Sequence, residues 1–270
     1  MENRLEERQS VLGDLSVRLL SYAQMKGKTI ARTGDFTRVL GISKTQERNL
    51  LSRLAQSGFI LRLRRGVYLI PERIPSGGRY NPGTAYILDK LFEDLEGRYQ
   101  LCGPSCFNFY GFDEQIPNIW YVYNNKISGT RTLAERSFVF IKVEDVRLGS
   151  VEQVETEPGS TLIYSSKLRT LVDAVYDWWR FQSLPRAYSW IQDTCKEKNT
   201  VDELIDLTIR FGNQSTIRRI GFIMENRTIA ETNLEKLSLS LTSKRSLIPL
   251  VPEGDTKGKT DTRWGIIQND

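Results

Sequence analysis

The sequence predicts an α+β protein with a small basic domain at the N-terminus and a larger mixed α/β domain after it. Its 270 residues are enough for two ordinary domains. A hydrophobic content of 39% with 26% charged residues is typical of globular rather than disordered chains. Residues 72–82 are rich in proline and glycine and poor in apolar side chains. We therefore place the linker between the two domains in this stretch.

Charge is distributed unevenly between the two predicted domains. The chain has a net charge of +5, but residues 1–80 hold 15 Lys and Arg against 7 Asp and Glu, a net charge of +8. The remaining residues hold 23 against 26, a net charge of −3. A basic surplus confined to one domain favours binding of a polyanion such as nucleic acid by that domain.

The first 71 residues show the order helix, short strand, helix, turn, helix and hairpin. Ser43 can cap a helix, and Gln46 stands three residues later, which is the spacing of a capping box. Leucines at positions 50, 51 and 54 give this helix a buried stripe. Two short apolar strands follow, joined by a tight turn at 64–66 that contains Gly66. This order predicts a winged helix-turn-helix domain over residues 1–75.

The second helix of this motif and the hairpin, or wing, together predict a surface for double-stranded promoter DNA. Arg48, Asn49 and Gln46 can pair with base edges in a major groove. We assign Lys44 and Arg53, nearer the helix ends, and the wing arginines to the DNA backbone or an adjacent minor groove. The alternative is a winged helix that binds protein and has a solvated basic face. The complete predicted set is Lys44, Thr45, Gln46, Arg48, Asn49, Arg53, Arg62, Arg64 and Arg65.

The larger domain is predicted over residues 82–250 and mixes the two kinds of secondary structure. The polar, glycine-containing end, residues 253–270, is predicted to be a flexible tail. Apolar patterning predicts helices at 84–95, 104–110, 167–181, 185–195, 201–211 and 216–226, and strands at 99–102, 119–123, 138–143 and 161–164, with a further strand near Arg131.

Composition argues against an enzyme and against a metal or other cofactor. The chain has no histidine, which removes histidine bases, serine and cysteine triads and histidine-bound metals. Three cysteines, at positions 102, 106 and 195, make neither a disulfide framework nor a zinc site. No nucleotide-binding glycine motif is present. Apolar runs too short to cross a membrane, and charge where a signal peptide would be apolar, predict a cytoplasmic protein.

Three segments carry a resemblance to a known family. They are Leu63-Arg64-Arg65-Gly66-Val67-Tyr68-Leu69-Ile70-Pro71, the helix start Ser166 to Tyr176 with Thr170-Leu171-Val172-Asp173, and Arg218 to Asn226. In these segments and in their order, the chain resembles the AbiEi antitoxins of bacterial AbiE-type toxin–antitoxin systems. It departs from the family where Lys167-Leu168-Arg169 replaces the usual Pro-Glu-Lys after the serine.

The resemblance implies a repressor of its own operon that also neutralises a nucleotidyltransferase-like toxin without a stable complex. For the antitoxin activity we select a polar face of the predicted helix, Lys167, Arg169 and Asp173, although a simple surface ion-pair face is the alternative. Two other functions remain open. One is an ordinary winged-helix regulator whose C-terminal domain senses a ligand or partner. The other is a DNA-processing enzyme that uses the winged helix for targeting.

Overall fold

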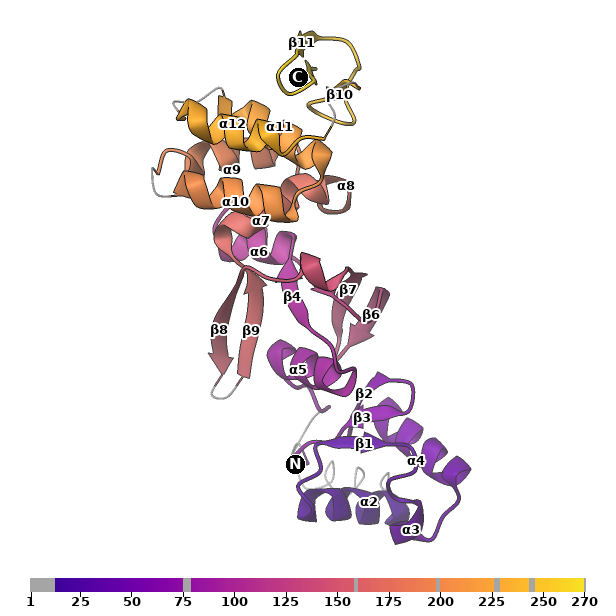
Figure 1. The fold of residues 1–270 in the computed structure, drawn as a ribbon. Coiled ribbons are helices and arrows are strands. Elements are labelled where there is room, and N and C mark those ends of the chain that lie inside the picture. The colour runs from indigo at the N-terminus through magenta and orange to yellow at the C-terminus, as the bar shows by residue number, and fades with distance from the viewer. Residues whose placement is uncertain are drawn as a thin grey trace. The chain divides into compact units, whose positions relative to one another are not determined.

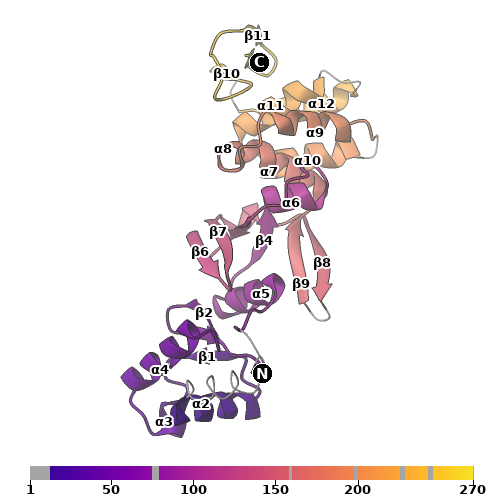
Figure 2. The same ribbon diagram turned by 180° about the vertical axis from the view of Figure 1, so that it is seen from behind.

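The computed structural model describes residues 13–74, 79–157, 160–197, 200–225, 229–242 and 246–269. The chain divides into two compact units, drawn from opposite sides in Figures 1 and 2. The first unit contains residues 1–96 and 131–138, and the second contains 97–130 and 139–270. A winged helix followed by a larger mixed α/β unit confirms the predicted fold class. None of the described helices is both long enough and apolar enough to cross a membrane.

The first unit has the predicted order of elements. Its three strands form an antiparallel sheet with the order β1-β3-β2, so the last two strands are the hairpin that forms the wing. The elements are α2 (Asp14–Met25), β1 (Ile30–Arg32), α3 (Thr37–Leu40), α4 (Lys44–Gln56), β2 (Leu61–Arg64), β3 (Val67–Leu69) and α5 (Thr84–Asp94).

A continuous apolar core holds the winged helix together. Leu50, Leu51 and Leu54 of α4 are buried, as their helical spacing predicts. They belong to one cluster with Leu19 and Leu20 of α2. Gly41, with a φ of 65°, makes the turn between α3 and α4, where the left-handed backbone favours glycine. The core therefore fixes α4 with its polar face outward.

The first unit extends beyond the predicted boundary. We expected the winged helix to end at residue 75, but α5 belongs to the same unit, which runs to Glu96. The Tyr80 N–H donates to the carbonyl of Gly58, and Asp94 makes ion pairs with Arg32 and Arg64. The composition of the linker does not reveal these contacts. Residues 1–12 and 75–78, which the prediction included, lie outside the described residues.

The larger sheet has the strand order β6-β7-β5-β4-β9-β8, and it belongs to the second unit except for residues 131–138 of β6 and β7, which belong to the first. Strand β4 pairs antiparallel with β5 and parallel with β9, and β9 forms an antiparallel hairpin with β8. Strand β6 lies where a strand was expected near Arg131, whereas β8 was not among the strands that patterning predicted. The elements are β4 (Tyr99–Cys102), α6 (Pro104–Phe109), β5 (Ile119–Asn124), β6 (Gly129–Leu133), β7 (Arg136–Lys142), the 3₁₀ turn Asp145–Arg147, β8 (Val151–Glu157) and β9 (Ser160–Ser165).

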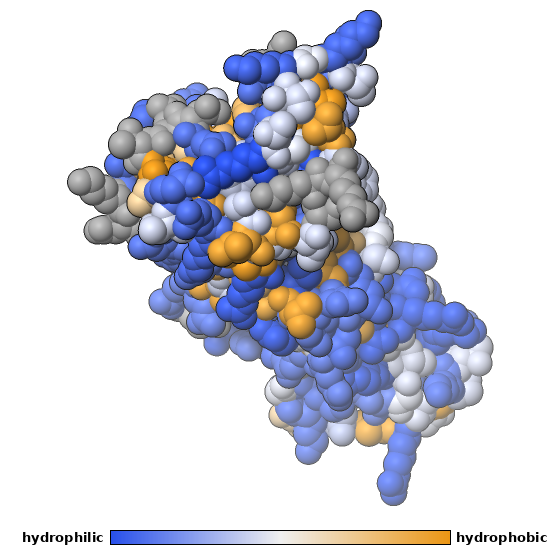
Figure 3. All heavy atoms as spheres, turned by 45° about the horizontal axis from the view of Figure 1, so that its top comes forward, coloured by the Kyte–Doolittle hydropathy of each residue, from blue (hydrophilic) through white to orange (hydrophobic). Residues whose placement is uncertain are grey.

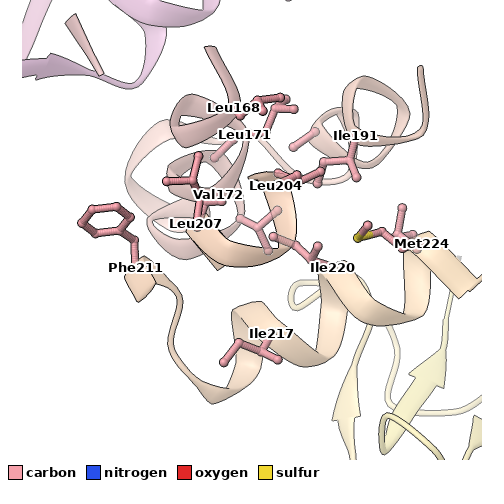
Figure 4. Close-up of a cluster of buried hydrophobic side chains, with 14 of the residues drawn as sticks. Leu168, Leu171, Val172, Ile191, Leu204, Leu207, Phe211, Ile217, Ile220 and Met224 are labelled. Atoms are coloured by element: carbon pink, nitrogen blue, oxygen red, sulfur yellow. The ribbon is translucent and has the colours of Figure 1, made fainter. Parts of the chain in front are cut away.

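Helices gather at one end of this sheet and enclose most of the core of the second unit (Figures 1 and 2). Figure 4 shows apolar side chains from α7, α9, α10 and α11 pointing toward one another. The predicted helix 167–181 is two helices, because the chain turns at Asp177. The helices are α7 (Lys167–Tyr176), α8 (Trp178–Phe181), α9 (Arg186–Thr194), α10 (Val201–Phe211), α11 (Gln214–Glu225) and α12 (Glu231–Leu239).

The predicted flexible tail is wrong, because residues 253–269 belong to an ordered C-terminal segment. Strands β10 (Ile248–Pro249), β11 (Lys259–Asp261) and β12 (Ile266–Gln268) form a small sheet of their own. Trp264 between them is completely buried and belongs to the main core of the second unit. Asp270, the last residue of the predicted tail, lies outside the described residues.

Two buried arginines of α11 hold this C-terminal segment through its carbonyl groups. Arg218 donates to the carbonyls of Ser246, Trp264 and Gly265. Arg219 donates to the carbonyls of Pro249 and Leu250. Burial lowers the pKa of both guanidinium groups, and hydrogen bonds to the carbonyls offset part of that cost.

The face drawn in Figure 3 is mostly hydrophilic, and its apolar atoms form scattered patches. Large apolar side chains that are exposed come from many different elements, among them Met25, Ile116, Val146, Trp179 and Leu239. Single exposed apolar residues are normal on soluble surfaces.

Candidate nucleic-acid interface

The start of α4 is set by a complete capping box. The Ser43 hydroxyl accepts from the Gln46 N–H at 3.2 Å, and the Gln46 side-chain carbonyl accepts from the Ser43 N–H at 2.8 Å. These two bonds satisfy backbone donors that a helix start otherwise leaves free. The Gln46 side chain, which we predicted to contact DNA, is therefore engaged in holding the helix end.

A buried carboxylate joins α4 to the loop before α3. Glu47 is 0% exposed, and its two carboxylate oxygens accept from the N–H groups of Gly34 (2.6 Å) and Phe36 (2.8 Å). These bonds fix the angle between the two helices of the helix-turn-helix. We did not select Glu47 from the sequence. The signal was present, because positions 47, 50, 51 and 54 share one helical face and the first of them is an acid.

Replacing Glu47 with alanine is expected to destabilise the helix-turn-helix by about 2–4 kcal/mol, because two inward-facing backbone N–H groups lose their acceptor. Hydrogen exchange of α4 amides in the full chain measures this loss. The control is Glu93→Ala, which removes the same groups from a solvent-exposed position on α5. Exchange in α4 that is equally slow in Glu47→Ala and wild type would contradict the role given to this carboxylate.

A groove of about 700 Å³ lies between the outer face of α4 and the wing. Six of its lining side chains are cationic, and no carboxylate is among the lining residues that the structure describes. The lining residues are Arg32 and Thr33 of β1 and the following turn, Lys44, Thr45, Arg48, Asn49 and Ser52 of α4, and Arg62, Arg64, Arg65, Gly66, Val67 and Tyr68 of the wing.

The wing is held against β1 at its tip. Gly66, with a φ of 78°, makes the tight turn, and its carbonyl accepts from the Thr33 N–H at 3.0 Å. The pairing of β2 with β3 shifts register between Arg62 and Arg64, as in a β-bulge. A bulge bends a strand and re-aims its side chains. Tyr68 is buried and packs in the core.

The structure brings most of the predicted DNA-binding residues to one surface. Seven of the nine line the groove, and the other two are Gln46 and Arg53. Arg53 lies in the last turn of α4 and lines a separate hollow with Leu15 and Phe59. Arg32, the sixth cation of the groove, was not among the predicted DNA-binding residues. It lies on β1, outside the helix and the wing from which those residues were chosen.

The groove has the chemistry that a DNA-binding surface requires. Guanidinium and ammonium groups neutralise phosphates, and the amide of Asn49 and the guanidinium of Arg48 can make paired hydrogen bonds to base edges. Both side chains are exposed on the outer face of α4. Arg62 and Arg65 on the wing have no ion-pair partner among the described residues, so their charge is available to a ligand.

The predicted antitoxin face on α7 is corrected by the structure. Arg169 and Asp173 are completely buried, and only Lys167 of the three is exposed. The Asp173 carboxylate accepts from Arg169 Nε at 2.9 Å and from Arg147 Nη2 at 3.1 Å. The Arg169 guanidinium also stacks 3.6 Å from the ring centre of Phe211. These residues form an internal ion-pair network, which no partner can reach without unfolding.

No group of three or more His, Cys, Asp or Glu side chains that could hold a metal ion is found among the described residues. Cys102 and Cys106 are buried, and burial raises the pKa of both thiols. Both thiols are therefore protonated at neutral pH and poorly reactive as nucleophiles.

Comparison with known proteins agrees with the geometry of the first unit. Residues 18–71 match the family described as transcriptional regulator, AbiEi antitoxin. The matched segment runs from α2 to the proline that follows β3. The resemblance inferred from the sequence is therefore confirmed for the winged helix, which matches the model of AbiEi antitoxin transcriptional regulators over these residues.

Likeness over the whole chain is found at the level of the fold. The crystal structure of the RV2827C protein from Mycobacterium tuberculosis covers 95% of this chain, and 92% of that protein is matched. The TM-score is 0.54 and the sequence identity is 13%. At this identity the likeness shows a shared fold alone. No curated protein sequence matches the chain.

Proposed function

We propose that this chain represses its own operon by binding promoter DNA, and that it neutralises a nucleotidyltransferase-like toxin encoded beside it without forming a stable complex. The groove between α4 and the wing carries the first half of the proposal. It combines an exposed helix face with six cations and no lining carboxylate among the described residues. Because chromosomal DNA is the proposed ligand, the protein would act in the cytoplasm.

Within the groove, we assign different roles to the helix and the wing. Arg48 and Asn49 lie on the exposed face of α4, where a recognition helix presents side chains to base edges. Arg62 and Arg65 lie on the hairpin and suit phosphates that flank the contacted bases. Lys44 and Thr45, in the first turn of α4, are suited to the backbone, since helix N-termini attract phosphate.

The antitoxin half of the proposal is supported by the family match of residues 18–71 and by the separate second unit. That unit has its own core and lacks the basic surplus of the first. Neither feature favours a second DNA-binding surface on this unit. We therefore assign protection from the toxin to the second unit, with Lys167 as the one member of the predicted face that is accessible.

Two alternative functions make different expectations. An ordinary winged-helix regulator would repress its promoter and give no protection from a toxin. A DNA-processing enzyme would cleave or modify DNA, but no described cluster of side chains suits a metal and the buried thiols are protonated. The family match favours the antitoxin regulator over both.

The experiment that tests the proposal separates its two halves in the full chain. Cells carry the neighbouring nucleotidyltransferase-like gene under an unrelated inducible promoter, and a reporter under the promoter of this chain's own operon. Wild type is expected to repress the reporter and restore growth. Arg48→Ala with Asn49→Ala is expected to relieve repression and still restore growth, because the second unit is unchanged.

Each failure of this experiment has a distinct meaning. A wild-type chain that represses but never protects would leave the ordinary regulator as the function. Loss of protection together with loss of repression, in a variant shown by circular dichroism to be folded, would contradict the division between the two units. A wild-type chain that does not repress would contradict the DNA-binding half.

A further inference from the structure

The groove contains two arginines that differ from the others, because one buried acid holds both. Asp94 is the last residue of α5, and its side chain is 1% exposed. One carboxylate oxygen accepts from Arg32 Nη2 at 2.6 Å, and the other accepts from Arg64 Nε at 2.5 Å. A single carboxylate thus bridges strands β1 and β2 behind the groove.

The geometry of the bridge leaves both arginines able to contact a ligand. Arg64 uses only its Nε, and Arg32 uses only one terminal nitrogen, for hydrogen bonds to the described residues. Their side chains are 37% and 57% exposed, and both line the groove. The remaining N–H groups are therefore held in place beside the groove, whereas Arg62 and Arg65 have no ion-pair partner among the described residues.

Asp94 occupies an unfavourable position at the C-terminal end of its helix. A carboxylate at the C-terminal end of a helix faces the negative end of the helix dipole, which is unfavourable. Burial adds a further cost, which the two arginines offset only while both stay in place. The helix dipole and burial therefore both disfavour the Asp94 carboxylate, and its two partners are cations of the groove.

We propose that Asp94 is a positioning residue that sets how strongly the groove prefers its target sequence over other DNA. This inference rests on the proposed binding of DNA by the same groove. The carboxylate acts in two ways. It orders Arg32 and Arg64 before DNA arrives, which saves the cost of fixing long side chains on binding. It also offsets part of their charge, which weakens attraction to phosphates of any sequence.

Removing the charge of Asp94 reverses both effects. Loosened arginines bind the target less well, which lowers the sequence preference, and the unopposed charge strengthens binding to phosphates of any sequence. One additional phosphate contact strengthens binding about fivefold near 0.15 M salt. Binding to random DNA is therefore expected to strengthen about fivefold in Asp94→Asn, and the preference for target over random DNA is expected to fall. The salt dependence of binding to random DNA becomes steeper by about one counterion.

The test measures fluorescence anisotropy of the full chain with two labelled duplexes of equal length. One carries the sequence that wild type enriches from a random pool, and the other is a scrambled version. The matched control is Glu93→Gln, which removes the same charge from the preceding residue, whose side chain is 62% exposed and pairs with Lys90. A purely structural role for Asp94 would lower the melting temperature and leave the preference and salt slope unchanged.

If Asp94→Asn does not fold, a second variant, Arg64→Lys, provides the test. Arg64→Lys keeps the groove charge but has no Nε to donate to Asp94, and an ammonium does not reproduce the planar geometry. It is expected to lower the preference as well. An unchanged preference in the folded variant overturns the role of Asp94 while leaving DNA binding intact. If wild type binds neither duplex, the proposed function itself fails.

Discussion

A triple variant of the groove, Lys44→Ala with Arg62→Ala and Arg65→Ala, is expected to bind promoter DNA about 10²-fold more weakly near 0.15 M salt. Each cation that neutralises a phosphate releases about one counterion, so its loss weakens binding about fivefold at this salt concentration. The three side chains line one groove, and none has an ion-pair partner among the described residues, so their charges act on DNA without competition.

Anisotropy titrations across a salt series measure this loss, and the slope of log affinity against log salt should become shallower by about three. The control variant replaces Arg18, Lys26 and Arg73 with alanine. These three residues are exposed cations of the same unit that do not line the groove. Equal weakening in the two triple variants would show that net charge, and not the groove, determines binding.

Trp264→Ala is expected to destabilise the second unit by about 3–5 kcal/mol, because it empties a large, completely buried site. The indole lies against α11 at Gly221, where any Cβ would overlap the ring. The indole N–H also donates to Glu225 at 2.6 Å, a bond that alanine cannot make. The C-terminal segment would then be held by the two arginines of α11 and by Tyr188, which donates to Leu250.

Urea unfolding of the full chain, followed by hydrogen exchange in α11, measures this effect. The control is Trp179→Ala, the same substitution at a side chain that is 57% exposed, which should change stability by no more than about 0.5 kcal/mol. If the two variants unfold alike, the segment after residue 253 contributes no more than the flexible tail that its composition suggests.

The sequence predicted the winged helix well because its signals are local. The capping box at Ser43, the leucine stripe of α4 and the glycine of the wing turn each specify a nearby piece of backbone. Once these pieces are packed, polar residues at neighbouring helical positions necessarily share one face. Seven of the nine predicted DNA-binding residues therefore line the groove.

Charged residues that are buried could not be recognised in the same way. Asp94, Arg169 and Asp173 are compatible with an exposed surface when only the sequence is read, because charge normally indicates solvent. Each is stabilised by partners that lie far along the chain, such as Arg32 for Asp94, at a separation of 62 residues. Only the folded chain shows that these charges are satisfied internally.

The C-terminal segment was misjudged for a related reason. Its composition is polar, and its anchor is the single residue Trp264, supported by arginines of α11. The family-like segments around Asp173 and Arg218 therefore hold the second unit together.

Whether promoter DNA binds in the groove between α4 and the wing is tested by its hydrogen-exchange footprint on the full chain. DNA binding in the groove is expected to slow exchange at residues 44–52 and 62–68. No change is expected around Arg53, Leu15 and Phe59, which line a separate hollow of the same unit. Protection confined to that hollow or to the second unit, with the groove unaffected, would contradict the assignment of the winged-helix groove as the DNA-binding surface.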